Sequence, residues 1–319
     1  MDYILREGMK FAMPLLIMAI GAIFSEKSGV TNLAVEGFQG VGAFFGSITI
    51  VMLMKVLKED NPVIMICALI AAFIGGALYA NIHALLCIKF KANQIISGVV
   101  VNIVAEALTV FLTSVFTEKF LGTASNKMYL NVATKVSVPG LSKIPVIGAL
   151  FTDMYVFELI IIVLAVFSWY LLYRTKYGMR MRACGENPQA VDAAGGNVAK
   201  IRYISVLISG GLSGIGGMCF AYSILSMFSS SIYMGYGYLA IAAMIFGNWN
   251  ILPAVGACLL FGMARSAGYK LCLVMELSSQ YQNLFLIVPY VLTLILLVFF
   301  SKKNRAPAAC GEVYDAGKR

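Results

Sequence analysis

Charged side chains are scarce in this chain, and their scarcity excludes an ordinary soluble protein. Only 12% of the 319 residues are Asp, Glu, Lys or Arg, whereas 60% are hydrophobic and the mean hydropathy is +0.86. A soluble core of this size cannot hide so much apolar surface. No charged residue or histidine occurs in the 62 residues from Tyr203 to Ala264. A run of that length crosses a bilayer about three times, at roughly 20 residues per helical span.

Motifs that carry enzyme chemistry are also missing. The chain has no G-x-x-x-x-G-K-[ST] phosphate loop, no H-E-x-x-H zinc motif and one histidine, His83. Its seven cysteines form no C-x-x-C pair and lie mostly in apolar runs, as small buried hydrophobes do. We therefore predict a non-enzyme that binds no cofactor or metal. His83 is read either as a hydrogen-bonded packing residue or as a ligand or proton relay.

Apolar runs between charged or Gly/Pro-rich breaks predict an all-α polytopic membrane protein, with residues 1–319 forming a single transmembrane domain. Around Gly247–Pro253 we expect two half-length or tightly turned helices. The first apolar run lacks a small-residue cleavage site, so no cleaved signal peptide is expected. The nine predicted spans are Tyr3–Phe24, Gly37–Met54, Val63–Ile88, Gln94–Phe116, Tyr155–Tyr173, Tyr203–Tyr222, Tyr236–Asn248, Leu252–Gly268 and Asn283–Phe300.

The distribution of positive charge predicts the orientation. With nine spans, 14 of the 24 Lys and Arg residues fall on one side, including the dense clusters at 174–202 and 302–319. Because cytoplasmic loops are enriched in Lys and Arg, we predict the N-terminus outside, the C-terminus inside, a cytoplasmic loop over 174–202 and an outer loop over 117–154. No long basic run supports nucleic acid as a partner.

Paired glycines predict where helices pack closely. Gly75-Gly76 and Gly210-Gly211 each lie inside an apolar run. Small residues let helix backbones approach in lipid, so these pairs are interpreted as helix contacts.

The loop at 174–202 contains the signals of a short helix. Asn187 is a favourable N-cap, Pro188 suits the first helical position, and Gly195-Gly196 provides a stop. A helix of about two turns is marginal alone in water, so it should be stabilised by docking. It docks either in a groove of another protein or on its own membrane domain. The face expected to dock comprises Ala190, Val191, Ala193 and Ala194.

Three stretches carry a family resemblance. Arg182–Gly195, continuing into Ile201–Tyr203, resembles the coupling loop of permease subunits in the ABC importer family of branched-chain amino acid, simple-sugar and nucleoside systems. Ser28–Gly37 resembles that family's broken-helix motif, and Gly235–Asn250 resembles its counterpart in the second half. The Gly-Val-x-Asn-x-x-x-Glu-Gly pattern is most similar to the shorter permease of nucleoside importers that use a basic-membrane-protein-type lipoprotein receptor.

The resemblance implies a permease subunit of an ATP-driven importer in the bacterial plasma membrane. Its expected partners are two ABC ATPase subunits that bind ATP and Mg²⁺, a second homologous permease in a heterodimer, and an extracellular substrate-binding lipoprotein. The residues expected to couple to the ATPase are Gly185, Glu186, Asn187, Pro188, Ala190, Ala193, Ala194 and Gly195.

Polar groups at membrane depth are the candidates for the solute pathway, because they are costly there. A carboxylate such as Glu106 costs about 2.5–3.5 kcal/mol by insertion scales, so it should face the bundle interior or a partner. Asn and Ser side chains also join helices, and this alternative stays open for each candidate. The candidates are Asn32, Glu36, Asn93, Ser97, Asn102 and Glu106.

The kind of solute follows from what the spans lack. They hold no cluster of Arg or Lys for a phosphate or carboxylate, which favours a neutral polar solute, a nucleoside first and a simple sugar second. A different class, an ion-driven secondary transporter or channel, would have to use Glu106 or His83 as its ion site.

Overall fold

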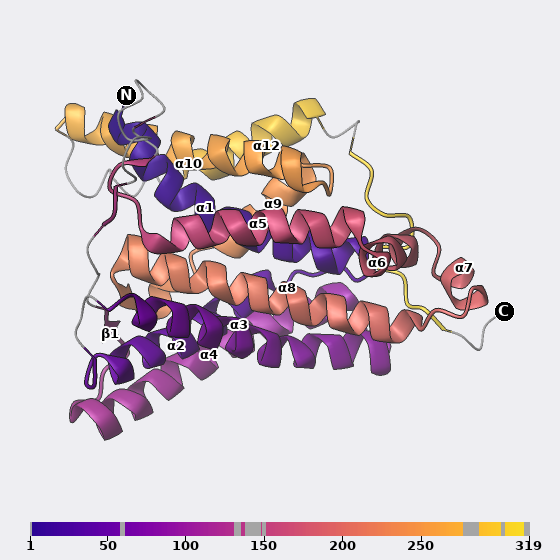
Figure 1. Ribbon diagram of the computed structural model, residues 1–319, viewed down its shortest axis with the longest axis horizontal. Coiled ribbons are helices and arrows are strands. Elements are labelled where there is room, and N and C mark those ends of the chain that lie inside the picture. Colours follow the sequence, from indigo (N-terminus) through magenta and orange to yellow (C-terminus); the bar gives the residue numbers. More distant parts are fainter. Residues whose placement is uncertain are drawn as a thin grey trace.

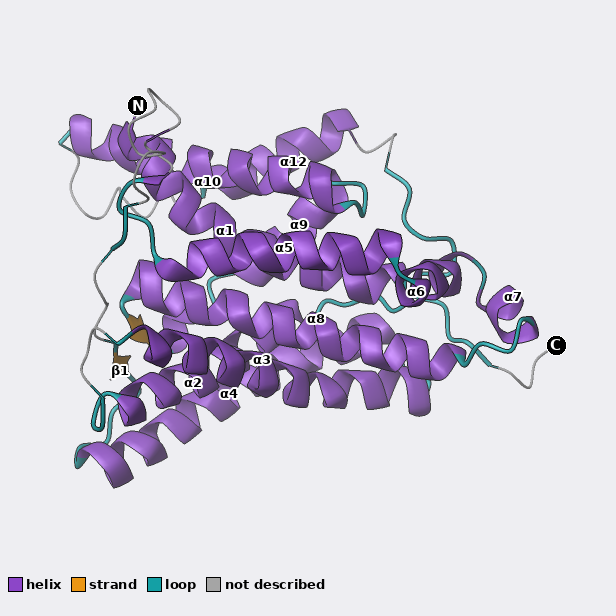
Figure 2. Ribbon diagram, in the orientation of Figure 1, coloured by secondary structure: helices purple, strands orange, loops and turns teal. Residues whose placement is uncertain are grey.

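The computed structural model describes residues 2–57, 61–130, 135–137, 148, 151–276, 287–300 and 304–315. Most of the described chain is helical, and the longer helices run along the long axis of the molecule (Figures 1 and 2). The elements are α1 Asp2–Lys27, α2 Val35–Leu53, α3 Pro62–Ala84, the π-helix η1 Leu85–Lys89, α4 Gln94–Leu121, β1 Met128–Tyr129, α5 Val156–Arg174, α6 Lys176–Glu186, α7 Pro188–Ala193, α8 Val198–Phe220, the π-helix η4 Ala221–Leu225, β2 Met227–Phe228, the 3₁₀-helix η5 Ser230–Ile232, α9 Tyr236–Phe246, α10 Ile251–Val274 and α12 Val288–Phe300.

Seven of the described helices are long and apolar enough to cross a membrane: α1, α2, α3 with η1, α4, α5, α8 with η4, and α10. The polytopic helical fold is thereby confirmed, and each of the nine predicted runs overlaps a helix. α9 is short, as expected, but α10 has 24 residues, so of the two predicted alternatives the half-length helix is wrong for α10. The two helices are instead joined by a tight connection over 247–250. The last predicted span begins outside the described residues. The one described sheet is a two-residue antiparallel pairing of β1 with β2.

Asparagine side chains cap the N-termini of four described helices, α3, α4, α7 and α8. Asn61 accepts a hydrogen bond from the Val63 N–H (3.0 Å) at the start of α3, and Asn93 and Asn197 cap α4 and α8 in the same way. Each side chain satisfies an N–H group that has no partner inside its helix. α8 therefore begins at Val198, earlier in the chain than the span predicted from Tyr203.

α1 and α8 form the centre of the bundle. α1 packs against α8 and α10, and α8 also packs against α2 and α3. The paired glycines lie at the α3–α8 contact, where a Cβ atom on Gly76 would run into the Gly210 carbonyl and one on Gly210 into the Gly76 carbonyl. The packing role predicted for these glycines is confirmed.

Exposed apolar stripes run along the outer helices. On α3 the stripe repeats every four residues and comprises Ile66, Ile70, Ile74, Leu78 and Ile82. An apolar stripe of this length is stable against hydrocarbon but not in water, as expected of a helix that faces lipid.

The connections gather at the two ends of the bundle, and the termini marked N and C lie at opposite ends (Figure 1). Backbone and side-chain contacts join 27–34, 89–93, 174–197, 247–250 and 304–315 at the end marked C. We call this the basic end, since it carries the Lys and Arg clusters around 89–91 and 174–182.

Candidate solute pathway and coupling loop

Glu36 joins the two breaks of the fold. Its side chain extends from the first turn of α2, after the non-helical stretch 28–34. It accepts hydrogen bonds from the backbone N–H groups of Gly235 (2.7 Å) and Gly237 (2.5 Å) at the start of α9. A helix N-terminus offers unpaired N–H groups and partial positive charge, so it favours a carboxylate. Glu36 is only 4% exposed and therefore caps α9 from inside the bundle.

Glycine is required on the α9 side of this contact. Gly235 has a φ of +85°, in the left-handed region that side chains disfavour. A Cβ atom on Gly237 would lie 2.6 Å from the Glu36 Cα, closer than atoms of this kind approach. The two glycines allow α9 to begin directly against α2.

Asn102 of α4 connects the same breaks. Its Nδ2 donates to the Leu33 carbonyl (2.8 Å) and to the Tyr238 hydroxyl (3.0 Å), and its Oδ1 accepts from the Gly37 N–H (2.7 Å). One buried amide thus holds the loop before α2, the start of α2 and α9. Asn102 and Glu36 are brought together at the start of α2, because Asn102 accepts from the N–H of the residue that follows Glu36.

Glu106 and Tyr238 mark an open polar face beside this pair. Tyr238 is 46% exposed, and Glu106, one turn beyond Asn102 on α4, is exposed as well. The Glu106 side chain makes no hydrogen bond or ion pair within the described residues. Glu106 is predicted to face either the bundle interior or a partner. Because its side chain is exposed on the outside of α4, it does not face the interior of this chain's helix bundle.

Two other candidates, Asn32 and Asn93, have structural partners. Asn32 donates to the Ser209 hydroxyl of α8 (2.9 Å) and accepts from the Ala34 N–H (3.0 Å), so it fixes the break to the central helix. The exposed Asn93 caps α4 by accepting from the N–H groups of Ile95 and Ile96. Neither side chain reaches the open polar face.

Ser97 pairs with the single histidine. Its hydroxyl lies 2.9 Å from His83 Nδ1, and His83 Nε2 lies 3.3 Å from the Thr31 carbonyl oxygen. Both side chains are buried. These are the contacts of a hydrogen-bonded packing residue, one of the two readings of His83. In the part of the chain that the structure describes, no three His, Cys, Asp or Glu side chains gather to hold a metal ion.

A buried acid that sequence reasoning missed joins the basic end. Glu26 is 6% exposed and accepts a hydrogen bond from Trp249 Nε1 (2.6 Å). An acidic residue in the last turn of a helix meets the negative end of the helix dipole, so its position before Lys27 already indicated a need for a partner. Trp249 lies in the α9–α10 connection with a φ of +54°, and its hydrogen bond to Glu26 ties this connection to α1.

The coupling loop is mostly helical. α6 and α7 fill it, and α7 has the predicted N-terminus, because Asn187 Oδ1 accepts from the Ala190 N–H (3.0 Å) and Pro188 follows it. Gly195, with a φ of +78°, ends the helix as expected. α7 projects beyond the ends of the longer helices (Figure 1).

The exposed surface of α7 differs from the prediction at one residue. Ala190, Ala193 and Ala194 are exposed on one face, whereas Val191 is buried and lies close to Gly196. Val191 therefore stabilises the turn into α8, and the three alanines remain free to contact another protein. Glu186 and Asn187 are exposed, while Gly185 and Pro188 are buried.

Comparison with known proteins decides the family. Residues 4–297 match the family model described as "Branched-chain amino acid transport system / permease component". The chain belongs to this family of permease components. The resemblance seen in the three sequence motifs is thereby confirmed. No solved structure matches the chain.

Three of the relatives are named for guanosine or nucleosides. The chain is 38% identical to the guanosine ABC transporter permease protein NupQ of Bacillus subtilis (strain 168), covering 100% of this chain and 98% of the relative. It is 36% identical to the nucleoside ABC transporter permease protein NupC of Lactococcus lactis subsp. cremoris (strain MG1363), with the same coverage. It is 24% identical to a second Bacillus subtilis protein, the guanosine ABC transporter permease protein NupP, over 83% of this chain and 74% of that relative.

Family membership settles the general role. The chain is a multi-pass membrane permease of an ABC transporter. It is not itself an enzyme and needs no cofactor, because a separate ATPase subunit uses the ATP. The predictions of an ABC permease, a non-enzyme and an ATPase partner are confirmed.

Proposed function

We propose that this chain is one of two different permeases of a nucleoside importer, and that Asn102, Glu106 and Tyr238 line its solute pathway. The observation that carries this proposal is the exposed Glu106 near the middle of α4. A carboxylate facing hydrocarbon is costly, so this face meets an aqueous path or another protein. If two permeases pack with these faces toward each other, Glu106 meets both another protein and an aqueous path between the two chains.

The chemistry of the face suits a nucleoside. The Glu106 carboxylate offers two acceptor oxygens, which match adjacent N–H donors on a guanine base. The half-exposed Tyr238 ring offers a surface on which a base stacks. The neutral solute predicted from the lack of basic clusters and the names of the relatives favour a nucleoside over a simple sugar.

The second permease is a homologue of this chain, not a copy. NupQ and NupP come from one organism and are both named as guanosine ABC transporter permeases. A heterodimer lets the partner supply different groups opposite Glu106. A substrate-binding lipoprotein outside the cell delivers the solute to the end of the bundle away from the coupling loop.

The basic end faces the cytoplasm in this proposal, with the N-terminus outside. Its Lys and Arg clusters follow the excess of positive charge in cytoplasmic loops. The exposed alanines of α7 then seat in a groove of the ATPase. Closure of the ATPase pair moves α7 and shifts the permeases between outward-open and inward-open states.

Transport by the assembled importer tests the function. Vesicles that hold both permeases and the ATPase should take up labelled guanosine when receptor and ATP are supplied. Glu106→Gln leaves one acceptor where the base needs two, so guanosine uptake should fall about tenfold. Uptake by this chain alone, driven by an ion gradient without ATP, would instead identify an ion-driven transporter that uses Glu106 or His83.

Cysteine labelling tests the pathway. Tyr238→Cys and Glu106→Cys should react with a membrane-impermeant charged thiol reagent, and guanosine should slow both reactions. Val104→Cys is the matched control, because Val104 is exposed on α4 but points about 160° away from Glu106. Equal reactivity of all three positions would contradict the assignment of this face.

A further inference from the structure

Residues 304–315 form a strap across the basic end (Figure 1, yellow). The strap connects segments that are far apart in the sequence. Its backbone N–H groups donate to three of them: Arg305 to the Asn248 side chain (2.9 Å), Ala309 to the Gly185 carbonyl (2.8 Å) and Gly311 to the Gly29 carbonyl (3.2 Å). One short segment therefore contacts the α9–α10 connection, the coupling loop and the α1–α2 break.

Side chains add further ties. Asp315 forms an ion pair with Lys91 before α4 (2.9 Å), and the Cys310 sulfur lies 3.4 Å from the Thr31 hydroxyl. The Ala308 N–H lies 3.4 Å from a carboxylate oxygen of Glu186. Exposed ion pairs contribute little, so the backbone hydrogen bonds carry most of the attachment.

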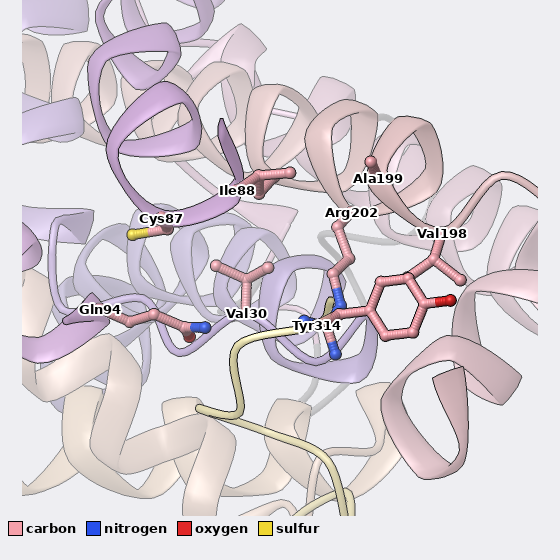
Figure 3. Close-up of a pocket in the computed structure, with 8 residues that line it drawn as sticks. All are labelled: Val30, Cys87, Ile88, Gln94, Val198, Ala199, Arg202 and Tyr314. Carbon is pink, nitrogen blue, oxygen red and sulfur yellow. The ribbon is translucent and has the colours of Figure 1, made fainter. Parts of the chain in front are cut away.

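Arg202 connects the strap to the break from inside. Its Nε donates to the Ser28 carbonyl (3.2 Å) and its Nη1 donates to the Glu312 carbonyl (2.8 Å). The side chain is 3% exposed and lines a cavity of about 30 Å³ with Tyr314 and Gln94 (Figure 3). One guanidinium thus spans the break and the strap, which also meet where Thr31 contacts Cys310.

The position of Arg202 is costly. A cation near the first turn of α8 meets the positive end of the helix dipole, and burial removes its water. Gly29 makes room for it, because a Cβ atom there would lie 2.5 Å from Arg202 Nη2. The hydrogen bonds of the buried guanidinium offset part of this cost, and they join the break to the strap.

We propose that Arg202 is a positioning residue for coupling: with the strap, it holds the coupling loop and the α1–α2 break as one body. Movement of α7 then reaches the break and, seven residues beyond Gly29, the Glu36 cap on α9. This inference rests on the proposed function, since it assigns the path by which the ATPase acts on the solute face.

The test measures uptake and ATP hydrolysis separately. Arg202→Lys keeps the charge, but an ammonium group cannot span two carbonyls as the guanidinium fork does. Receptor-stimulated ATP hydrolysis should remain, while guanosine uptake per ATP should fall about tenfold, the effect of losing one hydrogen bond to a charged group. A chain ending at Asn304 should give the same uncoupling.

Matched glycine variants control for backbone strain. Gly311→Ala and Gly122→Ala both place alanine at a φ near +80°, but only Gly311 lies in the strap. Gly311→Ala should lower uptake per ATP, whereas Gly122→Ala should not. If Arg202→Lys and Gly311→Ala instead prevent co-purification of the ATPase, the strap serves assembly and the proposal is overturned.

A crosslink tests whether strap and break move together. Thr31→Cys places a thiol beside Cys310, and diamide oxidation at raised pH, where the buried Cys310 thiol ionises, should join them. Uptake should stay within about twofold of the reduced variant, because the two segments never separate during the cycle. Loss of uptake that a reductant restores would overturn the proposal. Failure of the proposed function is distinct, since the unaltered importer would then show no ATP-dependent guanosine uptake.

Discussion

At the scale of single residues, the two carboxylates beside the proposed solute face have opposite surroundings. Both oxygens of Glu36 accept backbone N–H groups inside the bundle, whereas Glu106 is exposed on the outside of α4. The first carboxylate therefore serves the fold, and the second remains available to a solute or a partner.

Glu36→Gln should destabilise the protein. The amide NH₂ that replaces one oxygen meets an N–H donor of α9, which leaves a buried group without an acceptor at a cost of about 1–3 kcal/mol. Thermal unfolding in detergent should show a clearly lower Tm for Glu36→Gln. Glu106→Gln serves as the control and should leave Tm unchanged. Equal Tm values for both variants would mean that Glu36 does not cap α9.

Thiol chemistry provides a second prediction at this scale. Burial raises the pKa of Cys310 to about 12, with Glu26 raising it further and Thr31 and Arg202 lowering it. Only the thiolate reacts with iodoacetamide, so Cys310 should stay unmodified at pH 8 and react as the pH rises toward 12. Chain unfolded in dodecyl sulfate, in which the thiol titrates near its ordinary pKa, should react at pH 8–9. Rapid modification of Cys310 in the folded protein at pH 8 would show that the strap is not docked.

Because the pKa of Cys310 is raised in the folded protein, its contribution to the free energy of unfolding decreases at high pH. A thiol whose pKa is higher in the folded state stabilises the fold below its unfolded pKa of about 8.5. That contribution is lost as the pH rises from about 8.5 toward the folded value of about 12. Burial raises the pKa of Cys184, in the coupling loop, to about 11, so its contribution has the same sign.

Sequence reasoning found polar residues near the solute face but could not assign their roles. Asn102 and Glu36 were both recognised as costly groups at membrane depth. Their partners, Tyr238 and the N–H groups of α9, lie more than 130 positions away along the chain. Spacing within one helix carries no information about such contacts, which arise only when the helices pack.

At the scale of elements, local signals were the most reliable. Asn187, Pro188 and Gly195 predicted both ends of α7, because caps and stops act within one turn. The apolar run predicts an end at Gly268, but α10 continues to Val274, because a helix can extend past the apolar run that marks it in the sequence. The strap went unnoticed since its attachment relies on backbone groups, which every sequence contains.

A bulky substitution on the exposed face of α7 tests its proposed contact with the ATPase. Ala194→Trp adds a large ring to the exposed alanine face and should block a close fit with a partner groove. Receptor-stimulated ATP hydrolysis should fall at least tenfold, while the permease pair should still assemble. Ala183→Trp is the control, because Ala183 is also an exposed alanine but lies one helix earlier, in α6. Equal loss from both substitutions would show that the contact is not specific to α7.

At the scale of the whole molecule, the two sites of the proposed function lie apart along one axis. The polar face of α4 and α9 lies part-way along the bundle, and α7 lies at the basic end (Figure 1). α1 and α8 connect these regions, and their close packing leaves little room for independent movement. In the proposed cycle, we therefore expect motion at one end to be transmitted by rigid helices rather than through a flexible linker.

The orientation of this axis in the membrane is open to a direct test. If the excess of Lys and Arg sets the topology, the basic end is cytoplasmic and the β1 end is outside. Asn126→Cys, exposed beside β1, should then react with an impermeant thiol reagent on intact cells. Gln189→Cys, exposed on α7, should react only after the cells are opened. The reverse pattern would place α7 outside, beyond the reach of an ATPase, and would remove the basis for coupling through this loop.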